Sequence, residues 1–310
     1  MQARTIRSGT RGSPLALAQA NDVRRRLLAA HGLAEERIAI EVIRTSGDRI
    51  QDRPLSEVGG KGLFTKEIEE ALLSGAVDLA VHSMKDVQTE LPHGLSIATV
   101  LQREDVRDAF ISLRFASLAD MPAGAIVGTS SLRRRAQVRR LRPDLRVVEF
   151  RGNVETRLRK LQEGVADATF LATAGLNRLG LADRITAMLD TDIMLPAVAQ
   201  GAVGVEVRSS DEAVAELVAP LDHQATAICV AAARAFLARL EGSCRTPIAG
   251  LARLEGGELH MIGQLVKPDG SDAITRRRSG PAAQAMSIGG DLADEIIAAA
   301  GPDLHAFMSA

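Results

Sequence analysis

The first two thirds of the chain alternate between short apolar runs and longer stretches whose apolar positions recur with helical spacing. The apolar runs predict strands at residues 5–9, 38–45, 78–82, 125–128, 146–150 and 168–172. The longer stretches predict helices at residues 14–30, 63–73, 132–141 and 154–164, and another near Leu176. Strands and helices that alternate in this order are typical of α/β domains with parallel sheets.

Polar capping residues mark where three of these helices begin. Ser13 precedes Pro14 at the first, the Thr-Ser-Ser tripeptide at residues 129–131 precedes the third, and Asn153 precedes the fourth. Side-chain oxygens at such positions accept hydrogen bonds from the free backbone N–H groups of the first helical turn.

The last third of the chain has a different pattern. Residues 195–208 predict a return crossing that ends in a buried strand, and a long apolar helix follows at residues 224–240. Turns at residues 256–257 and 268–270 separate three strand-like runs, and a closing helix is predicted at residues 292–300. This pattern indicates a small α+β domain.

Composition excludes several classes of protein. The 310 residues are 46% apolar and 25% charged, which rules out wholesale disorder, and no apolar leader or membrane-spanning run is found. Two cysteines cannot form a secreted disulfide framework, so the sequence predicts a cytoplasmic protein. The net charge of −1 and the lack of Trp and Tyr disfavour a single-stranded nucleic-acid binder.

Arginine makes up nearly all of the 38 basic residues, an excess that a GC-rich genome would also explain. Position is more informative than number, because arginines adjoin the predicted helix caps: Arg11, Arg133, Arg134, Arg151 and Arg157. Free N–H groups at a helix start, together with guanidinium groups, bind anions. These turns predict a cleft for a ligand with several carboxylates or phosphates; ordinary capping with solvated arginines is the alternative.

Asp86 and Cys244 are candidates for chemistry. Asp86 ends a predicted strand beside Lys85, where a carboxylate can stabilise a cation, donate a proton or serve only as a turn residue. Cys244 lies in a turn beside Arg245, so its thiol can act as a nucleophile or an attachment point. Cys229 lies on the apolar helix and is expected in the core. The histidines and cysteines show no metal-ligand spacing.

Residues 45–62 are rich in glycine and charge. They predict a mobile lid over the cleft, with a plain surface loop as the alternative. The GGKGLF run within them lacks the spacing and the Ser or Thr of a phosphate-binding loop.

Eight stretches of the sequence, taken in order, resemble the porphobilinogen deaminase family, also called the hydroxymethylbilane synthases. They are TRGSPLALAQA, VGGKGLFTKEIE, DLAVHSMKDV, REDVRDAF, GTSSLRRRAQ, RGNVETRLRKL, LPAVAQGAVGVE and RLEGSCRTPI, and they cover nearly the whole chain. The resemblance implies a cytoplasmic transferase that joins four porphobilinogen molecules head to tail, with release of ammonia. The product would be hydroxymethylbilane, the linear precursor of haem and related tetrapyrroles.

The resemblance also implies a dipyrromethane cofactor, made from two substrate units and held by a thioether to Cys244. Asp86 matches the family's catalytic aspartate, which would stabilise the cationic azafulvene left when ammonia departs. The residues that match cofactor-binding positions are Lys85, Asp86, Thr129, Ser131, Arg133, Arg134 and Arg151. Those that match substrate-binding positions are Arg11, Ser13, Gln19, Arg151, Arg157 and Arg178, with Lys61 and Phe64 on the lid and Gln200 lining the cleft.

The implied fold is α/β, with two lobes like those of type II periplasmic binding proteins and a small α+β C-terminal domain. The first lobe would comprise residues 1–104 and 200–220, and the second residues 105–199. The C-terminal domain, residues 221–310, would carry the cofactor cysteine. The family expectation is a monomer that passes its product to uroporphyrinogen-III synthase, with no metal, membrane or nucleic-acid partner.

Two positions depart from the family pattern: Gln88 stands where proline is common, and Ser243 where glycine is usual. Neither change removes a functional group, but Ser243 can alter the loop that presents the thiol. Two alternatives stay open. One is a non-catalytic anion-binding protein of the same two-lobed shape, and the other is a nucleic-acid binder that uses the arginines at 133–135 and 139–140.

Overall fold

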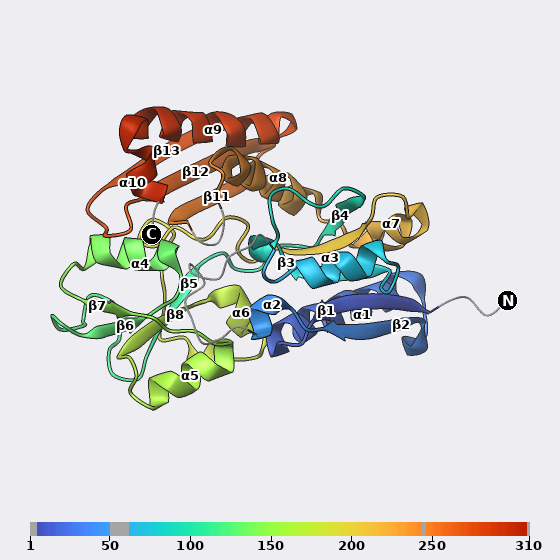
Figure 1. Cartoon of the computed structure of the whole chain (residues 1–310), viewed down its shortest axis with the longest axis horizontal. Coiled ribbons are helices and arrows are strands. Elements are labelled where there is room, and N and C mark those ends of the chain that lie inside the picture. Colours follow the sequence, from blue (N-terminus) through green and yellow to red (C-terminus); the bar gives the residue numbers. More distant parts are fainter. Residues whose placement is uncertain (1–4, 50–61, 243–245, 309–310) are drawn as a thin grey trace. The chain divides into compact units, whose positions relative to one another are not determined.

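The computed structural model describes residues 5–49, 62–242 and 246–308, which fall into two compact units (Figure 1). The first unit contains the described residues up to Arg49, with residues 62–104 and 202–227. The second contains residues 105–201 and the described residues from 228 onward.

The first unit is built on a five-stranded sheet in the order β2-β1-β3-β10-β4. Strands β1, β2 and β3 are parallel, and β10 runs antiparallel to both β3 and β4. Their bounds are Ile6–Arg11 for β1, Ile38–Ile43 for β2, Leu79–Ser83 for β3, Leu95–Val100 for β4 and Val203–Arg208 for β10. The last strand to be synthesised therefore lies inside the sheet.

The second unit has a five-stranded sheet of the same design, in the order β7-β6-β8-β5-β9. Here β6, β7 and β8 are parallel, and β5 runs antiparallel to β8 and β9. The bounds are Asp108–Ser112 for β5, Ile126–Gly128 for β6, Arg146–Val148 for β7, Ala168–Ala172 for β8 and Ala187–Met188 for β9. Each sheet thus holds four strands that run in one direction and one strand that runs antiparallel to them.

Among the described residues, the chain passes between the two units after β4, before β10 and once more between residues 227 and 228. This confirms the predicted return crossing, and the shared strand order gives both lobes the type II periplasmic-binding-protein arrangement that the resemblance implies.

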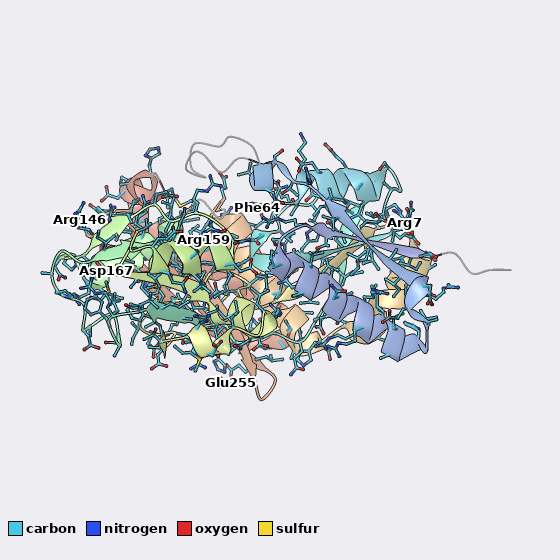
Figure 2. The ribbon with its side chains drawn as sticks, turned by 90° about the horizontal axis from the view of Figure 1, so that it is seen from below. Arg7, Phe64, Arg146, Arg159, Asp167 and Glu255 are labelled. Carbon is cyan, nitrogen blue, oxygen red and sulfur yellow. The ribbon has the colours of Figure 1, made fainter. Side chains whose placement is uncertain are left out.

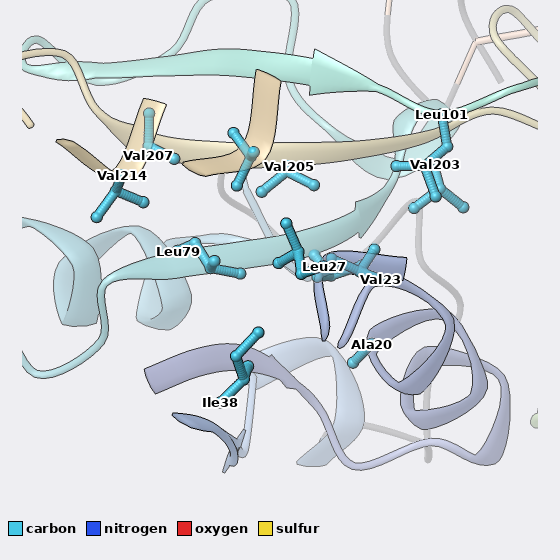
Figure 3. Close-up of a cluster of buried hydrophobic side chains, with 12 residues drawn as sticks. Ala20, Val23, Leu27, Ile38, Leu79, Leu101, Val203, Val205, Val207 and Val214 are labelled. Atoms are coloured by element: carbon cyan, nitrogen blue, oxygen red, sulfur yellow. The ribbon is translucent and has the colours of Figure 1, made fainter. Parts of the chain in front are cut away.

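Helices cover the first sheet: α1 (Pro14–His31), α3 (Lys66–Leu73) and α7 (Glu212–Val218). Helix α1 begins where predicted, because the Ser13 hydroxyl accepts a hydrogen bond from the backbone N–H of Ala16. It ends at Gly32, whose φ of 60° is the left-handed conformation that glycine adopts without strain. Apolar side chains of α1, β2, β3, β10 and α7 form one core, which includes Leu27, Leu79 and Val205 (Figure 3).

Helices of the second lobe follow the same rule: α4 (Leu132–Leu141), α5 (Val154–Gln162) and α6 (Thr173–Arg178). Ser131 caps α4 by accepting from the Arg134 N–H, and Asn153 caps α5 by accepting from the Thr156 N–H. The predicted caps are therefore confirmed.

The C-terminal part is an antiparallel sheet of β11 (Ile248–Glu255), β12 (Glu258–Val266) and β13 (Ala273–Pro281). Helices α8 (Gln224–Arg239), α9 (Ala285–Ala300) and α10 (Leu304–Met308) accompany it, and α9 packs on the sheet (Figure 1). A Cβ atom on Gly289 of α9 would lie 2.0 Å from the carbonyl oxygen of Ala232, so the backbones of α8 and α9 touch there.

Some elements differ from the expectation. Strand β4 and helix α7 are not predicted by the apolar pattern, and α9 begins at Ala285 rather than near Leu292. Residues Ser46–Arg49 form one helical turn, α2, at the described start of the predicted lid. The second compact unit combines the second lobe with the C-terminal part, so the three-domain division stays a prediction. Among the described residues, no helix is long and apolar enough to cross a membrane.

Candidate functional site

The turn that carries Asp86 follows strand β3 directly. A short 3₁₀ turn, Met84–Asp86, begins where β3 ends, and the backbone N–H of Met84 donates to the carbonyl of Ala202 at 3.0 Å. Strand β10 continues this support, because Val203 pairs with Ser83. Lys85 and Asp86 are both half-buried, so the return strand holds a carboxylate and an ammonium group at the carboxyl end of β3.

Gln19 connects helix α1 to the same turn. Its side chain is buried, and its amide Nε2 donates to the Ser83 hydroxyl at 2.8 Å. This contact places Gln19 against the residue from which the Asp86 turn begins, and its predicted role in binding substrate stays a prediction.

Arg11 lies at the end of β1 and is held by two neighbours. Its Nε and Nη2 atoms donate to the two carboxylate oxygens of Asp48, at 3.3 and 2.5 Å. Its guanidinium carbon lies 4.2 Å from the centre of the Phe64 ring, a cation–π contact. The Phe64 side chain is labelled in Figure 2. Ser13 has its hydroxyl oxygen at the cap of α1. The structure therefore brings together two of the predicted residues, Arg11 and Phe64, while Ser13 caps α1.

A buried acid–histidine cluster lies behind the Asp86 turn. His82 of β3 and Glu206 of β10 are 2.9 Å apart, and both are buried. Glu69 of α3 is also buried, and burial raises the pKa of its carboxyl, with a further rise from the charge of Glu206; hydrogen bonds from Thr65 and Gln88 and the charge of His82 oppose the rise. Gln88, which replaces a common proline, thus contributes a hydrogen bond to this cluster.

Arg133 and Arg134 of α4 share one carboxylate in the second unit. Their Nη2 atoms each lie 2.7 Å from an oxygen of Asp108, and all three side chains are buried. The Nη1 atoms donate to backbone carbonyls, from Arg133 to Leu195 and from Arg134 to Phe170. Two guanidinium groups against one carboxylate leave this cluster with an excess positive charge.

The pKa of Asp108 reflects the same imbalance. Burial raises it, but the charges of Arg133 and Arg134 and hydrogen bonds from Arg134 and Gln200 outweigh burial, so the pKa lies well below its ordinary value. The Nε atoms of both arginines are buried without a hydrogen-bond partner among the described residues. Buried donors in this state point to a missing acceptor.

Arg151 and Arg157 extend the cationic region at the start of α5. Burial and the charges of Arg134 and Arg151 together lower the pKa of Arg157 to about 10, against an opposing rise from the charge of Glu149. Arg157 Nε donates to the carbonyl of Gly152 at 2.9 Å. The half-buried Arg157 therefore lies in a field that is positive on balance.

The remaining predicted residues of the second unit have backbone-directed contacts. Thr129 Oγ1 accepts from the Ser131 N–H at 3.2 Å, and Arg178 Nη2 donates to Gly201 at 2.8 Å. Gln200 Nε2 donates to Asp108 Oδ1 at 3.0 Å and to the carbonyl of Val106 at 2.8 Å. Arg178 thus binds the segment through which the chain returns to the first unit, and Gln200 of that segment binds residues at the start of the second unit.

Two predicted residues, Cys244 and Lys61, lie outside the described residues. Cys229 is a buried free cysteine of α8, as expected. Among the described residues, no group of three or more His, Cys, Asp or Glu side chains is placed to hold a metal ion.

Three contributors were missed from the sequence: Asp48, Asp108 and the His82–Glu206–Glu69 cluster. Asp108 lies in the REDVRDAF stretch and His82 in the DLAVHSMKDV stretch, which the resemblance includes, whereas Asp48 lies in the segment read only as a lid. Their partners are 25 or more residues away in most cases, as the 37-residue separation of Arg11 and Asp48 illustrates.

Buried arginines with unused donors and a positive surrounding field fit a ligand that carries several carboxylates, and a dipyrromethane group is such a ligand. Within the second unit, these arginines lie on helix α4 and at the start of α5.

Comparison with known proteins points to one family. A family model described as "Porphobilinogen deaminase, dipyromethane cofactor binding domain" matches residues 6–216, and "Porphobilinogen deaminase, C-terminal domain" matches residues 227–298. The porphobilinogen deaminases of Paracoccus denitrificans and Nitrobacter hamburgensis are each 59% identical to this chain, and each alignment covers 94% of this chain and 93% of the relative.

Among solved structures, an ABC-transporter periplasmic substrate-binding protein from Coxiella burnetii is 16% identical, with a TM-score of 0.44 over 70% of this chain and 91% of that chain. That similarity is too low to support an inference, so the fold rests on the strand orders. Family models that match most of the chain, together with relatives at 59% identity, establish that the chain belongs to the porphobilinogen deaminase family.

Proposed function

We propose that this chain is a transferase that condenses four porphobilinogen molecules head to tail into hydroxymethylbilane, releasing ammonia at each step. Family membership supports the reaction. The observation that carries the proposal is the buried cationic cluster of Arg133 and Arg134, which Asp108 only partly neutralises. A chain of pyrroles with acetate and propionate groups has the carboxylates that such a cluster needs.

The residues proposed to hold the dipyrromethane cofactor are the thiol of Cys244, through a thioether, and the side chains of Lys85, Asp86, Thr129, Ser131, Arg133, Arg134 and Arg151. When bound, this group supplies the pyrrole carbon to which the first substrate unit is joined. The arginines neutralise its carboxylates, and the unpartnered Nε donors of Arg133 and Arg134 are available to that end.

Asp86 is proposed as the catalytic residue. Loss of ammonia from the aminomethyl group of porphobilinogen leaves positive charge on the pyrrole, and a fixed carboxylate beside the ring N–H stabilises that charge. The turn is braced by β10 and by the contact between Gln19 and Ser83, so the carboxylate is held in place before the charge develops. The same carboxyl can carry a proton to the departing amine.

The residues proposed to bind the substrate are Arg11, Ser13, Gln19, Arg151, Arg157 and Arg178, while Lys61 and Phe64 belong to the lid. The positive field around Arg157 supports its part in this set. We also propose a cytoplasmic monomer, divided into the three domains given above, whose product is passed to uroporphyrinogen-III synthase.

The experiment that tests this function is the intact mass of the denatured protein, purified as wild type, Cys244→Ser and Cys229→Ala. We expect wild type and Cys229→Ala to carry a mass excess equal to two linked porphobilinogen-derived rings, and Cys244→Ser to lack it. Because Cys229 is buried in α8, it is the matched control for the loss of a thiol.

Turnover of porphobilinogen by the same preparations completes the experiment, with Asp86→Asn added. We expect Asp86→Asn to keep the mass excess and lose nearly all turnover, since the variant keeps the shape of the side chain but not its charge. A loaded but equally active Asp86→Asn protein would refute the catalytic assignment. An unmodified wild type that gains no mass when porphobilinogen is added would favour a non-catalytic anion-binding protein.

A further inference from the structure

The guanidinium group of Arg11 is fixed on two sides by its own chain. Asp48 binds the edge formed by Nε and Nη2, and Phe64 covers one face of the group at 4.2 Å. A guanidinium has a second edge, formed by Nη1 and Nη2, that can also receive a carboxylate in a bidentate manner. Of the contacts that the structure describes for Arg11, none is made by Nη1.

Asp48 is itself held in position. The Thr45 hydroxyl donates to Asp48 Oδ2 at 2.8 Å, which is the same oxygen that accepts from Arg11 Nε. Burial raises the pKa of the Asp48 carboxyl, but hydrogen bonds and charge from Arg11 and hydrogen bonds from Thr45 outweigh burial and lower it. The carboxyl is therefore ionised at neutral pH and remains paired with Arg11.

The turn that presents Asp48 is anchored to the start of α3. The backbone N–H of Gly47 donates to the carbonyl of Leu63 at 2.7 Å, and the backbone N–H of Ser46 donates to Glu67 at 2.8 Å. A Cβ atom on Gly47 would lie 2.3 Å from the Phe64 ring, so glycine is needed for the ring to approach. Asp48 and Phe64 are thus parts of one packed unit around Arg11.

We infer that Asp48 is a positioning residue, which together with Phe64 orients Arg11 so that its Nη1–Nη2 edge receives one carboxylate of the substrate. This inference rests on the proposed function. Asp48 occupies one edge of the Arg11 guanidinium and Phe64 covers one face, so a substrate carboxylate can approach from one direction only. This restriction favours substrates whose acetate or propionate group has the right position on the pyrrole ring.

The test is steady-state kinetics of the holoenzyme with porphobilinogen, comparing wild type and Asp48→Asn. We expect KM to rise roughly 10-fold, because a lost charge-assisted hydrogen bond leaves Arg11 free to turn, and kcat to stay within about 2-fold. Asp48→Glu keeps the charge, so its KM should lie between those of wild type and Asp48→Asn. Asp22→Asn, which removes an exposed ion pair on α1, is the matched control and should behave as wild type.

A second variant, Thr45→Val, keeps the shape of a buried side chain and removes only the hydroxyl that orients Asp48. It should also raise KM, by a smaller factor, and it tests the inference if Asp48→Asn does not fold. An unchanged KM in Asp48→Asn would overturn the inference. A lower KM would also overturn it, because Asp48 would then compete with the substrate for Arg11. A wild-type holoenzyme that lacks turnover would overturn the proposed function and this inference with it.

Discussion

At the scale of single residues, Asp108 determines the balance of buried charge at the start of helix α4. Asp108 pairs with Arg133 and Arg134 and receives a hydrogen bond from Gln200, so one carboxylate organises two helical arginines and the return segment. Asp108 holds both arginines in place but neutralises only one of their two positive charges. The pair can therefore still bind an anion, which a neutral ion pair cannot do as well.

Asp108→Asn should lower the free energy of unfolding by about 3–5 kcal/mol at pH 7, because the variant leaves buried guanidinium groups without their counter-charge. The folded pKa of Asp108 lies below the ordinary value of 3.8, so the stabilisation is present above that pH and is lost as the pH falls toward the folded pKa. Urea unfolding of both proteins between pH 7 and about pH 2 measures the difference, which should stay constant down to about pH 4 and shrink below that pH.

Asp294→Asn is the control, because its ion pair with Arg239 at 2.6 Å is exposed. A difference between Asp108→Asn and wild type that stays constant with pH would contradict the assigned ionisation.

Residues near in sequence were predictable, and residues joined only by the fold were not. The caps Ser13, Ser131 and Asn153 were assigned correctly because a cap bonds within three positions. Asp48 and Asp108 were missed because nothing local marks the arginine that each will meet. An acidic residue looks the same in the sequence whether it is solvated or paired with a buried cation.

At the scale of elements, close backbone approach decides which helices can pack. Helices α8 and α9 touch at Gly289, where any side chain would meet the carbonyl of Ala232 at 2.0 Å. The next residue, Gly290, has open space around its Cβ position. Two adjacent glycines of one helix therefore have opposite roles, although both look alike in the sequence.

Gly289→Ala should destabilise the protein by about 1–3 kcal/mol, because the added methyl group forces α8 and α9 apart. Gly290→Ala, its matched control, should stabilise by about 0.5–1 kcal/mol through helix propensity alone. Thermal or urea unfolding measures both. If the two variants change stability in the same direction, the close contact between these helices is not a determinant of stability.

Elements with a clear period were predicted and those without one were not. Strand β8 lies at the predicted residues, and the three C-terminal strands are separated by the predicted turns. Strand β4 was missed because its alternation is weak, and α9 begins at Ala285, seven residues before the predicted start.

At the scale of the whole molecule, the antiparallel strand of the first sheet lies far along the chain from the parallel strands β1, β2 and β3. Strand β10 pairs with both β3 and β4, so the first unit is complete only when residues 203–208 are in place. This topology ties the stability of the first unit to a segment distant in sequence, and no local pattern predicts which sheet will receive it.

Val205→Ala, in the buried centre of β10, should cost about 2 kcal/mol by loss of apolar burial. Because Val205 belongs to the first unit, hydrogen exchange measured by mass spectrometry should accelerate more in β1, β3 and β4 than in β6 and β8. Equal acceleration in both units would mean that they unfold as one cooperative block.

The support that β10 gives to the Asp86 turn has a consequence for synthesis on the ribosome. The N–H of Met84 bonds to Ala202, so the turn stays incomplete until the whole second lobe has been translated. At roughly 5–20 residues per second, that delay is on the order of ten seconds. During this interval the nascent first lobe has an unpaired edge at β3, where a chaperone or a neighbouring nascent chain can bind before the strand that belongs there arrives.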